Sequence, residues 1–234
     1  MRVNSKNIYI SNKKRFYRSI FILTVLIITI TVFIFIKCSS DHIFTICIDP
    51  GHGGYDTGAV NETYNVYEKD IVLDVSLRLG ELLKKKDVKV IYTRKKDKVP
   101  WKNQRESLEG RCKISNKYNA DIFISIHANN FPKSKDVKGT EVWCRFKDTE
   151  AEVLANGISN GLSDIGYTRN RGLRYETDKG LYVLRNTNST SILVELGYLS
   201  NPEDLMFLMS EDGKNQCAEA MTKAVMNYYS TKND

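Results

Sequence analysis

An uncharged apolar run of 18 residues, 19–36, is the feature that most limits how this chain can fold. It follows 18 residues that carry six Lys and Arg and no Asp or Glu, and it ends at Lys37. About 20 apolar residues form a helix long enough to cross a bilayer core, and positive charges before such a helix favour a cytoplasmic N-terminus. We therefore expect a basic cytoplasmic segment at 1–18, a transmembrane anchor at 19–37 and an extracytoplasmic remainder, that is, a single-pass protein of the cell membrane.

A cleaved signal peptide is the main alternative for this run. Signal peptides have an apolar region of about 7–15 residues and small residues at the cleavage site. The run here is longer, and the stretch IFIKCSS that ends it has no A-x-A pattern. Lipidation of Cys38 is disfavoured by the bulky Ile36 and the charged Lys37 before it. The sequence therefore favours an uncleaved anchor.

The net charge of +7 lies entirely in this N-terminal part. Residues 1–37 hold seven Lys and Arg and no acidic residue, so residues 38–234 are close to neutral. Nucleic-acid binding would need a basic patch on the folded domain itself, and we therefore expect no nucleic-acid partner. The five cysteines are widely spaced and form no C-x-x-C, which argues against a zinc knuckle or a dense disulfide framework but leaves room for one long-range disulfide.

Strand-like and helix-like segments alternate after a short polar linker at 38–43. The pattern predicts strands at 43–49, 88–94, 120–129, 139–146, 181–185 and 191–199, and helices at 68–88, 103–119, 148–163, 202–209 and 214–229. Such alternation is typical of an α/β fold with a mostly parallel twisted sheet.

Two of the three histidines lie where predicted strands end. His52 follows TICID within a GHGG loop, and His127 follows IFISI. In an open α/β sheet, ligands gather beyond the carboxyl ends of the strands, so the two side chains can converge. A lone histidine after a strand is usually structural, but a pair at strand ends favours a site. The glycines around His52 allow the sharp backbone turn that this placement needs. His42, in the linker, is interpreted as a solvated surface residue.

A catalytic zinc ion typically takes three protein ligands and keeps a fourth position for water. Glu68 is the best candidate for the third ligand, because it opens the predicted helix 68–88 at the same edge of the sheet. A first-turn acid also complements the helix dipole, which is the structural alternative. Asp56 and Asp70 compete with Glu68 on composition alone.

Glu195 lies within the apolar strand SILVELGYL. Charged residues are rarely buried without a partner, so this carboxylate requires an explanation. One alternative is an ion pair with an arginine such as Arg94 or Arg105. The other is a carboxylate of raised pKa near a metal, which can take a proton from water.

Five motifs occur in one order along the chain: IDPGHGGYDTGAV, the glutamate of EKDI, TRKKD, ADIFISIHAN and LVELGYLSNPED. Together they resemble those of the zinc-dependent N-acetylmuramoyl-L-alanine amidases of the AmiC/CwlD-like type, the amidase_3 family. The similarity spans residues 44 to about 229. Each motif is modest alone, but five in family order with fitting spacing are highly specific.

The resemblance implies an α/β fold with a mostly parallel sheet and helices on both faces, in a catalytic domain at 44–230. It implies that His52, Glu68 and His127 bind one Zn²⁺ and that Glu195 is the catalytic glutamate. Family members hydrolyse the amide between the lactyl group of muramic acid and the L-alanine that begins the stem peptide. The expected substrate is therefore peptidoglycan, and the expected process is cell-wall remodelling.

Two other classes remain as alternatives. One is a catalytically inactive homologue that binds the wall or a partner as a scaffold, and the other is a zinc peptidase that cuts within the stem peptide. The complete set of three ligand candidates and Glu195 favours the active amidase. Arg171, Arg174 and Arg185 are candidate contacts to carboxylates of the stem peptide or to the glycan, although loop arginines are most often solvated. Asn129, just past His127, is a candidate to orient substrate or a ligand, and a structural role as a loop cap is the alternative.

The short form of the chain, one anchor and one catalytic domain, is similar to amidases that trim the spore cortex of spore-forming Gram-positive bacteria. Daughter-cell separation and general wall turnover are the other roles open to it. No obvious autoinhibitory helix occurs between residues 140 and 180, and no wall-binding repeat is attached. Localisation would then come from the membrane anchor, and the need for an accessory protein is open.

Overall fold

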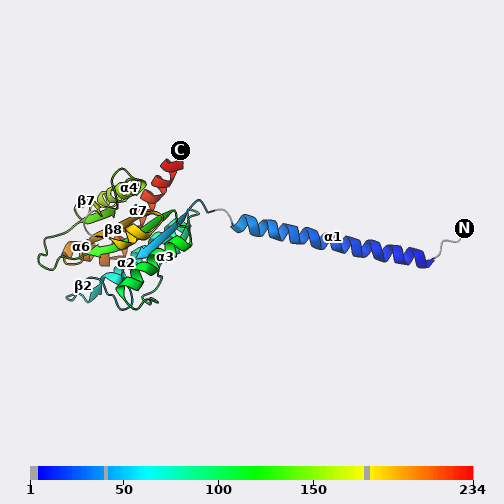
Figure 1. Ribbon diagram of the computed structural model, residues 1–234, viewed down its shortest axis with the longest axis horizontal. Coiled ribbons are helices and arrows are strands. Elements are labelled where there is room, and N and C mark those ends of the chain that lie inside the picture. The colour runs from blue at the N-terminus through cyan, green and yellow to red at the C-terminus, as the bar shows by residue number, and fades with distance from the viewer. Residues whose placement is uncertain (1–4, 40–41, 177–179, 234) are drawn as a thin grey trace. The chain divides into compact units, whose positions relative to one another are not determined.

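The computed structural model describes residues 5–39, 42–176 and 180–233 (Figure 1). The chain divides into two compact units, Met1–His42 and Ile43–Asp234. In the first unit, side chains are described for residue 13 and for residues 15–32. Residues 40 and 41 of the linker expected at 38–43, and the side chain of Cys38, lie outside this described part.

The first unit contains one long helix, α1 (Ser5–Ser39). Its segment Arg15–Val32 is long and apolar enough to cross a membrane, and none of that segment is buried. A signal sequence near an N-terminus can also form an apolar helix that meets this criterion, so the helix by itself fits both the anchor and the signal peptide.

The second unit is built on a six-stranded sheet with the order β4-β1-β5-β8-β6-β7. Its strands are β1 (Thr45–Pro50), β4 (Lys89–Tyr92), β5 (Ile122–Asn129), β6 (Thr140–Cys144), β7 (Asn170–Tyr175) and β8 (Thr190–Tyr198). Strands β4, β1, β5 and β8 are parallel, whereas β6 runs antiparallel to β8 and pairs in parallel with β7. The mostly parallel sheet expected from the sequence is confirmed, with one reversed pair of strands at its edge.

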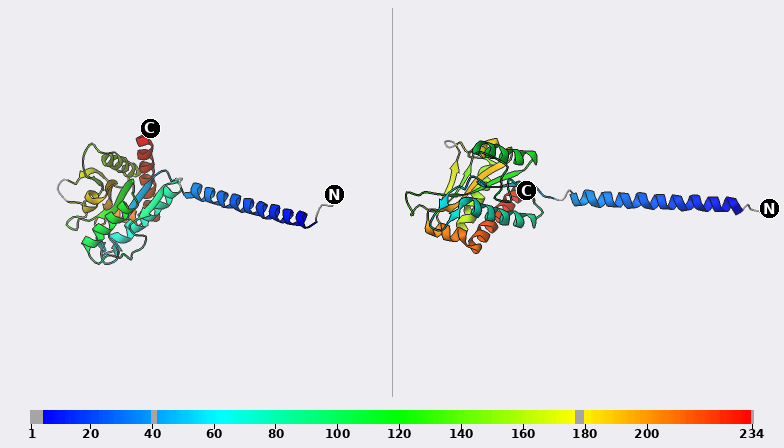
Figure 2. Two further views of the ribbon diagram at one scale, coloured as in Figure 1. Left: turned by 45° about the vertical axis from the view of Figure 1, so that its right-hand side comes forward. Right: turned by 90° about the horizontal axis from the view of Figure 1, so that it is seen from below.

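Helices cover both faces of this sheet, as Figure 2 shows. They are α2 (Glu68–Lys84), α3 (Gln104–Lys117), α4 (Glu150–Ile165), α5 (Tyr182–Asn186), α6 (Pro202–Met209) and α7 (Glu211–Asn233). A larger apolar cluster joins the sheet to α2, α4, α6 and α7, and a smaller one joins it to α3 and α5. The α/β class with helices on both faces is therefore confirmed.

Along the central strands, successive apolar side chains alternate between the two faces of the sheet, so the core is divided into two clusters. In β5, Ile122, Ile124 and Ile126 belong to the larger cluster. Phe123, between the first two of them, belongs to the smaller cluster. Successive side chains of a strand point to opposite faces, and burying each of these large apolar side chains contributes roughly 1.5–3 kcal/mol. The apolar runs identified in the sequence are thus strands buried on both sides.

Three local features differ from the expectations. Residues 181–185, expected as a strand, form the short helix α5 after Leu181, because Val183 and Leu184 pack together into the smaller cluster. A five-residue apolar run does not by itself separate a strand from a helical turn. Strand β7 was not expected, and neither was the hairpin that β2 (Val60–Asn61) forms with β3 (Val66–Tyr67). Four cysteines are free and buried in the described part: Cys47, Cys112, Cys144 and Cys217.

Replacing Gly213 by alanine should destabilise the second unit. A Cβ at Gly213 would lie 2.1 Å from the carbonyl oxygen of Phe207, a backbone atom that moves only with its chain. We expect the free energy of unfolding to fall by about 1–3 kcal/mol, measured by urea denaturation of the full chain in detergent.

Gly157→Ala is the matched control, because Gly157 is also helical and a Cβ there meets nothing closer than 3.7 Å. Alanine is the better helix former, so this variant should gain about 0.5–1 kcal/mol. Equal effects of the two substitutions would contradict the packing described here.

Candidate metal centre

The loop after β1 turns through an unusual backbone conformation at His52. The φ angle of His52 is 58°, and that of the following Gly53 is 121°. A non-glycine residue with positive φ is uncommon and is held in place only by its surroundings. The turn expected from the GHGG sequence is therefore present, and His52 itself takes part in it.

Two buried arginines hold this loop by its carbonyl oxygens. Arg94 donates from Nε to Pro50 at 3.0 Å and from Nη2 to Gly51 at 2.7 Å. Arg111 donates from Nη1 to Pro50 at 2.8 Å and from Nη2 to His52 at 2.5 Å. Three successive carbonyl groups are thus fixed, which accounts for the strained conformation at His52.

Asp49, the residue before Pro50, balances the charge of Arg111. Its Oδ1 accepts from Arg111 Nη1 at 2.5 Å and from Thr93 Oγ1 at 2.5 Å, and its Oδ2 accepts from Ser125 Oγ at 2.7 Å. Burial would raise the pKa of Asp49, but Arg111 and these hydrogen bonds outweigh burial and hold the pKa below its usual 3.8. Sequence reasoning missed this network, because its members are far apart in the chain.

His52, Glu68 and His127 come together at the carboxyl ends of β1 and β5. Glu68 Oε1 lies 3.1 Å from His52 Nε2 and 2.9 Å from His127 Nδ1. The three possible ligand atoms all lie within 4.8 Å of one another. The sequence-predicted ligand set is therefore brought to one point, from three separate segments of the chain.

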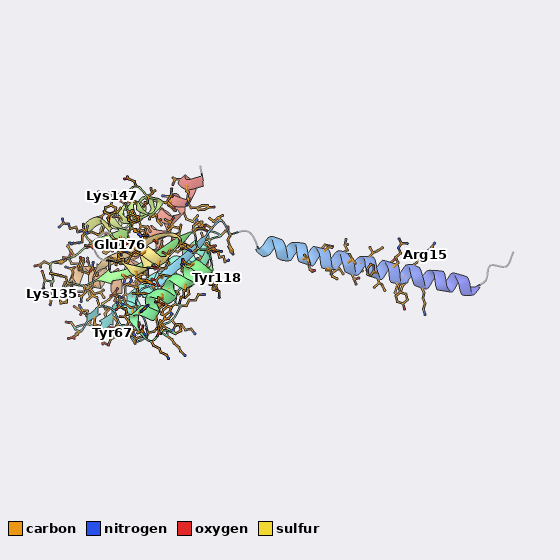
Figure 3. All side chains as sticks on the ribbon, in the orientation of Figure 1. Arg15, Tyr67, Tyr118, Lys135, Lys147 and Glu176 are labelled. Atoms are coloured by element: carbon orange, nitrogen blue, oxygen red, sulfur yellow. The ribbon has the colours of Figure 1, made fainter. Side chains whose placement is uncertain are left out.

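The helix that supplies Glu68 begins directly after the hairpin. Tyr67, labelled in Figure 3, is the last residue of β3 and immediately precedes Glu68. Glu68 Oε2 accepts from the backbone nitrogen of Ala59 at 2.8 Å, and Oε1 accepts from that of Ala128 at 3.1 Å. A Cβ at Gly58 would lie 2.5 Å from Glu68 Oε2, so this close approach requires glycine.

The electrostatics of the cluster favour a cation. Burial would raise the pKa of Glu68, but its hydrogen bonds to His127 and His52 hold that pKa well below the usual value. Burial would lower the pKa of His52, but Glu68 and Asp56 raise it to about 8. The buried carboxylate thus attracts positive charge, either as protons on the imidazoles or as a metal ion between them.

The two acids that competed with Glu68 have other places. Asp56 Oδ2 lies 2.8 Å from Nδ1 of His52, the ring nitrogen that faces away from Glu68. A carboxylate on the far nitrogen of a metal-binding histidine fixes the ring and raises its basicity. Asp70 is exposed and lies outside the cluster of three. Asp56 is therefore a partner of His52, and neither acid lies in the cluster of His52, Glu68 and His127.

Glu195 lies in β8 beside the cluster and forms no ion pair among the described residues. It pairs in register with His127 on β5 and with Glu141 on β6. Its Oε2 is buried without a hydrogen-bond partner. Burial raises the pKa of Glu195 to about 7, and repulsion from Glu68 and Glu141 adds to this effect. The attraction of His127 acts in the opposite direction but is outweighed.

The ion-pair alternative for Glu195 is wrong. Arg94 holds the loop carbonyls, and Arg105 pairs with Glu109 at 3.0 Å on the exposed side of α3. Two cavities meet the site instead. One, of about 160 Å³, is lined by His52 and His127, and the other, of about 600 Å³, is lined by Glu195. The larger volume lies in the range of roughly 300–1,000 Å³ that is usual for ligand-binding clefts.

The family model for Amidase_3, N-acetylmuramoyl-L-alanine amidase, matches residues 46–227. The chain therefore belongs to the Amidase_3 family of N-acetylmuramoyl-L-alanine amidases, which confirms the resemblance read from its five motifs and the hydrolase class expected from them.

Individual relatives agree with this assignment. The chain is 31% identical over 198 residues to the germination-specific N-acetylmuramoyl-L-alanine amidase of Bacillus subtilis, with 81% of each chain covered. It is 34% identical over 197 residues to an uncharacterized cell wall amidase of Bacillus anthracis, covering 80% of this chain but only 36% of that protein. The present chain thus spans about a third of one curated relative and four fifths of another.

Solved structures share the fold. An N-acetylmuramoyl-L-alanine amidase from Clostridium difficile 630 superposes with a TM-score of 0.74 at 32% identity, covering 82% of this chain and all of that one. The CwlD amidase from Clostridioides difficile, in complex with the GerS lipoprotein, gives a TM-score of 0.75 at 31% identity, with 80% of this chain and 99% of that one covered.

If the cluster of His52, Glu68 and His127 holds a metal ion, Asp56→Asn should weaken its binding without removing any of these three side chains. The amide cannot serve as the anionic partner of His52, and loss of such a partner typically costs about 10–100-fold in metal affinity. We expect this loss in a competition titration of the full chain against a chelating dye. Asp70→Asn is the control and should leave the affinity unchanged. Equal affinities for the two variants would show that Asp56 does not orient His52.

Asp49→Asn should lower stability in a pH-dependent way. Removing one partner of a buried ion pair leaves Arg111 uncompensated and costs about 3–5 kcal/mol at pH 7. Because the folded pKa of Asp49 is depressed, its contribution is present above the unfolded pKa and is lost as the pH falls through the folded value.

Urea unfolding at neutral and acidic pH tests this expectation. The difference between wild type and Asp49→Asn should shrink as the pH drops below 3.8. Glu81→Gln, which removes an exposed carboxylate paired with Lys84, should cause no measurable change at either pH. A difference for Asp49→Asn that stays constant with pH would contradict the network.

Proposed function

We propose that this chain is a zinc-dependent N-acetylmuramoyl-L-alanine amidase. It would hydrolyse the amide between the lactyl group of muramic acid and the L-alanine that begins the stem peptide of peptidoglycan. The observation that carries the proposal is the cluster of His52, Glu68 and His127, with their ligand atoms within 4.8 Å, beside the unpaired carboxylate of Glu195.

The donor set fits zinc. Two imidazole nitrogens and one carboxylate oxygen are a known ligand set of catalytic zinc sites, which keep a further position open. Asp56 on the far nitrogen of His52 is the outer partner that such a ligand usually has. We therefore assign His52, Glu68 and His127 as the ligands of one Zn²⁺ ion. When bound, zinc would lower the pKa of a water molecule and polarise the scissile carbonyl group.

Glu195 is assigned as the general base and acid. Its pKa, raised to about 7, lets the carboxylate accept a proton from the attacking water and return it at neutral pH. The proton would go to the nitrogen of the departing L-alanine, so that one carboxylate serves both steps. Within the part of the chain that the structure describes, Oε2 has no hydrogen-bond partner, so no structural contact competes for this carboxylate oxygen.

Glu195→Gln and His127→Ala separate the two roles. Glu195→Gln should keep zinc and lose turnover by about 10²–10⁴-fold, because the amide cannot accept the proton. His127→Ala should lose both zinc and turnover, because it removes a ligand.

Metal content by atomic emission and cleavage of N-acetylmuramoyl-L-alanyl peptides, read by mass spectrometry, give the two readouts. Loss of zinc from Glu195→Gln, or full activity of His127→Ala, would overturn the assigned roles. Asp70→Asn serves again as the control and should match wild type in both measurements.

We also propose the layout of the whole chain: a basic cytoplasmic segment at 1–18, a membrane anchor at 19–37, a linker at 38–43 and the catalytic domain at 44–230. The helix α1 is long enough for this anchor. The anchor would hold the catalytic domain outside the membrane, next to the wall. Retention of residues 1–37 in mature protein from a membrane fraction, measured by intact mass, tests the anchor against a cleaved signal sequence.

For the biological role we propose processing of spore peptidoglycan. The support is the 31% identity, over four fifths of both chains, to a germination-specific amidase. The CwlD amidase of similar fold was solved with a lipoprotein, GerS. If the zinc-loaded chain is inactive on its own, an accessory lipoprotein is the first missing component to supply.

A further inference from the structure

A row of functional side chains crosses four neighbouring strands. His127 on β5 pairs with Glu195 on β8, and Glu195 pairs with Glu141 on β6. Beyond Glu141 the register of β6 and β7 shifts between Thr140 and Val142, and Arg171 of β7 reaches Glu141 there. The row therefore continues from the proposed catalytic carboxylate to an arginine.

Glu141 anchors two arginines in the cavity beside Glu195. The side chain of Glu141 is only 6% exposed, and its Oε1 accepts from Arg171 Nε at 2.5 Å. The hydroxyl of Tyr198 donates to the same oxygen at 3.1 Å, and Arg174 Nη2 lies 3.8 Å from it. The Arg171 guanidinium also lies 5.4 Å from the centre of the Tyr198 ring. A buried acid thus holds two basic side chains at defined places.

These arginines keep donors free for a ligand. Arg171 bonds to Glu141 through Nε, and neither of its two terminal nitrogens makes a hydrogen bond within the described residues. Arg174 makes only the long ion pair to Glu141 there and is 42% exposed. Both line the cavity of about 600 Å³ together with Glu195. The two guanidinium groups outnumber the Glu141 carboxylate that anchors them, so this group of three side chains carries one net positive charge beside Glu195, and a ligand carboxylate would neutralise it.

We propose that Arg171 and Arg174 form a subsite for a free carboxylate on the residue that follows L-alanine in the stem peptide. This inference rests on the proposed function and adds the substrate feature that the cavity selects. Paired guanidinium donors are suited to a carboxylate, which accepts from them in a forked geometry.

The spacing of the row fits this position of the carboxylate. Adjacent strands lie about 4.8 Å apart, so β7 is roughly 10 Å from Glu195 on β8. The Arg171 guanidinium leans back over Tyr198 of β8, which shortens that distance. An extended peptide advances about 3.3–3.6 Å per residue. Two extended residues, L-alanine and the next one, span roughly 7 Å, which is comparable with a strand separation of roughly 10 Å shortened by the long arginine side chains.

Arg185, the third arginine singled out in the sequence, has a different place. Its Nε donates to the buried Glu176, and it does not line this cavity. The side chain of Arg185 is 46% exposed, similar to that of Arg174. It therefore provides a matched control of the same residue type on the same domain.

Two substrates that differ in one group test the proposal. N-acetylmuramoyl-L-alanyl-D-glutamate γ-methylamide carries a free α-carboxylate on its second residue, and N-acetylmuramoyl-L-alanyl-D-isoglutamine γ-methylamide carries an α-amide there, with the γ-carboxyl group blocked in both. We expect the zinc-loaded full chain in detergent to prefer the acid in kcat/KM by about 10–100-fold, as expected for charge-assisted hydrogen bonds. Arg171→Gln and Arg174→Gln should each lower the acid-to-amide ratio towards one, and Arg185→Gln should keep it.

Arg174→Gln is the more conservative variant for folding, because Arg174 is exposed and lies farther from Glu141. Thermal unfolding of each variant shows whether the domain is intact. Equilibrium binding of the two substrates to Glu195→Gln, measured by calorimetry, provides a readout that does not depend on turnover, and the acid should again bind about 10–100-fold more tightly.

The outcomes separate this inference from the proposed function. Cleavage of both substrates at equal rates by wild type would overturn the carboxylate subsite and leave the amidase proposal intact. An acid preference that survives both Arg171→Gln and Arg174→Gln would also overturn it. Cleavage of neither substrate, with an accessory lipoprotein also supplied, would overturn the amidase proposal, and the subsite with it.

Discussion

The carboxylate of Glu68 is held in a position where only 4% of the residue is exposed, and the rest of the site is arranged around it. An unpaired charge at such a position is strongly unfavourable. Here two backbone nitrogens, of Ala59 and Ala128, donate to the carboxylate, and two imidazoles face its Oε1. Both histidine rings thus face one oxygen of a carboxylate that the local backbone holds by both of its oxygens, which makes the cluster a candidate cation site.

The topology of the sheet sets what lies beside that site. Parallel β1 and β5 bring His52 and His127 to one edge, and the neighbouring β8 brings Glu195 into register with His127. The antiparallel pairing of β8 with β6 then sets Glu141 opposite Glu195. Burial raises the pKa of Glu195, and repulsion from the Glu141 carboxylate on the adjacent strand adds to this effect. The pKa of Glu195 is thereby raised to about 7. The same Glu141 accepts from Arg171, so the proposed catalytic carboxylate and the proposed carboxylate subsite share one acidic neighbour.

Much of this site could be predicted from local sequence, and the part that could not depends on long-range partners. His52, Glu68, His127 and Glu195 stand out because each interrupts a local pattern: a strand end, a helix start or an apolar run. Whether they act as metal ligands and base stays a prediction. The fold class was predictable for the same reason, since strand and helix periods differ.

The missed features have no such local mark. Arg94 and Arg111 look like ordinary strand-end and helix residues until the carbonyls of Pro50 and Gly51 lie beside them. Asp56 competed with Glu68 as a ligand, because composition does not show which histidine nitrogen it would meet. Helix α5 was mistaken for a strand, since five apolar-rich residues fit both.

Digestion of purified peptidoglycan by the full chain in detergent tests the central claim most directly. Products would be analysed by mass spectrometry for the metal-depleted protein and after zinc is restored. The account predicts stem peptides that begin with L-alanine and glycans without peptide, which appear only when zinc is present. Cleavage within the stem peptide would indicate a zinc peptidase instead. Bound zinc without any product, with an accessory lipoprotein also supplied, would contradict the assignment of this chain as an active amidase.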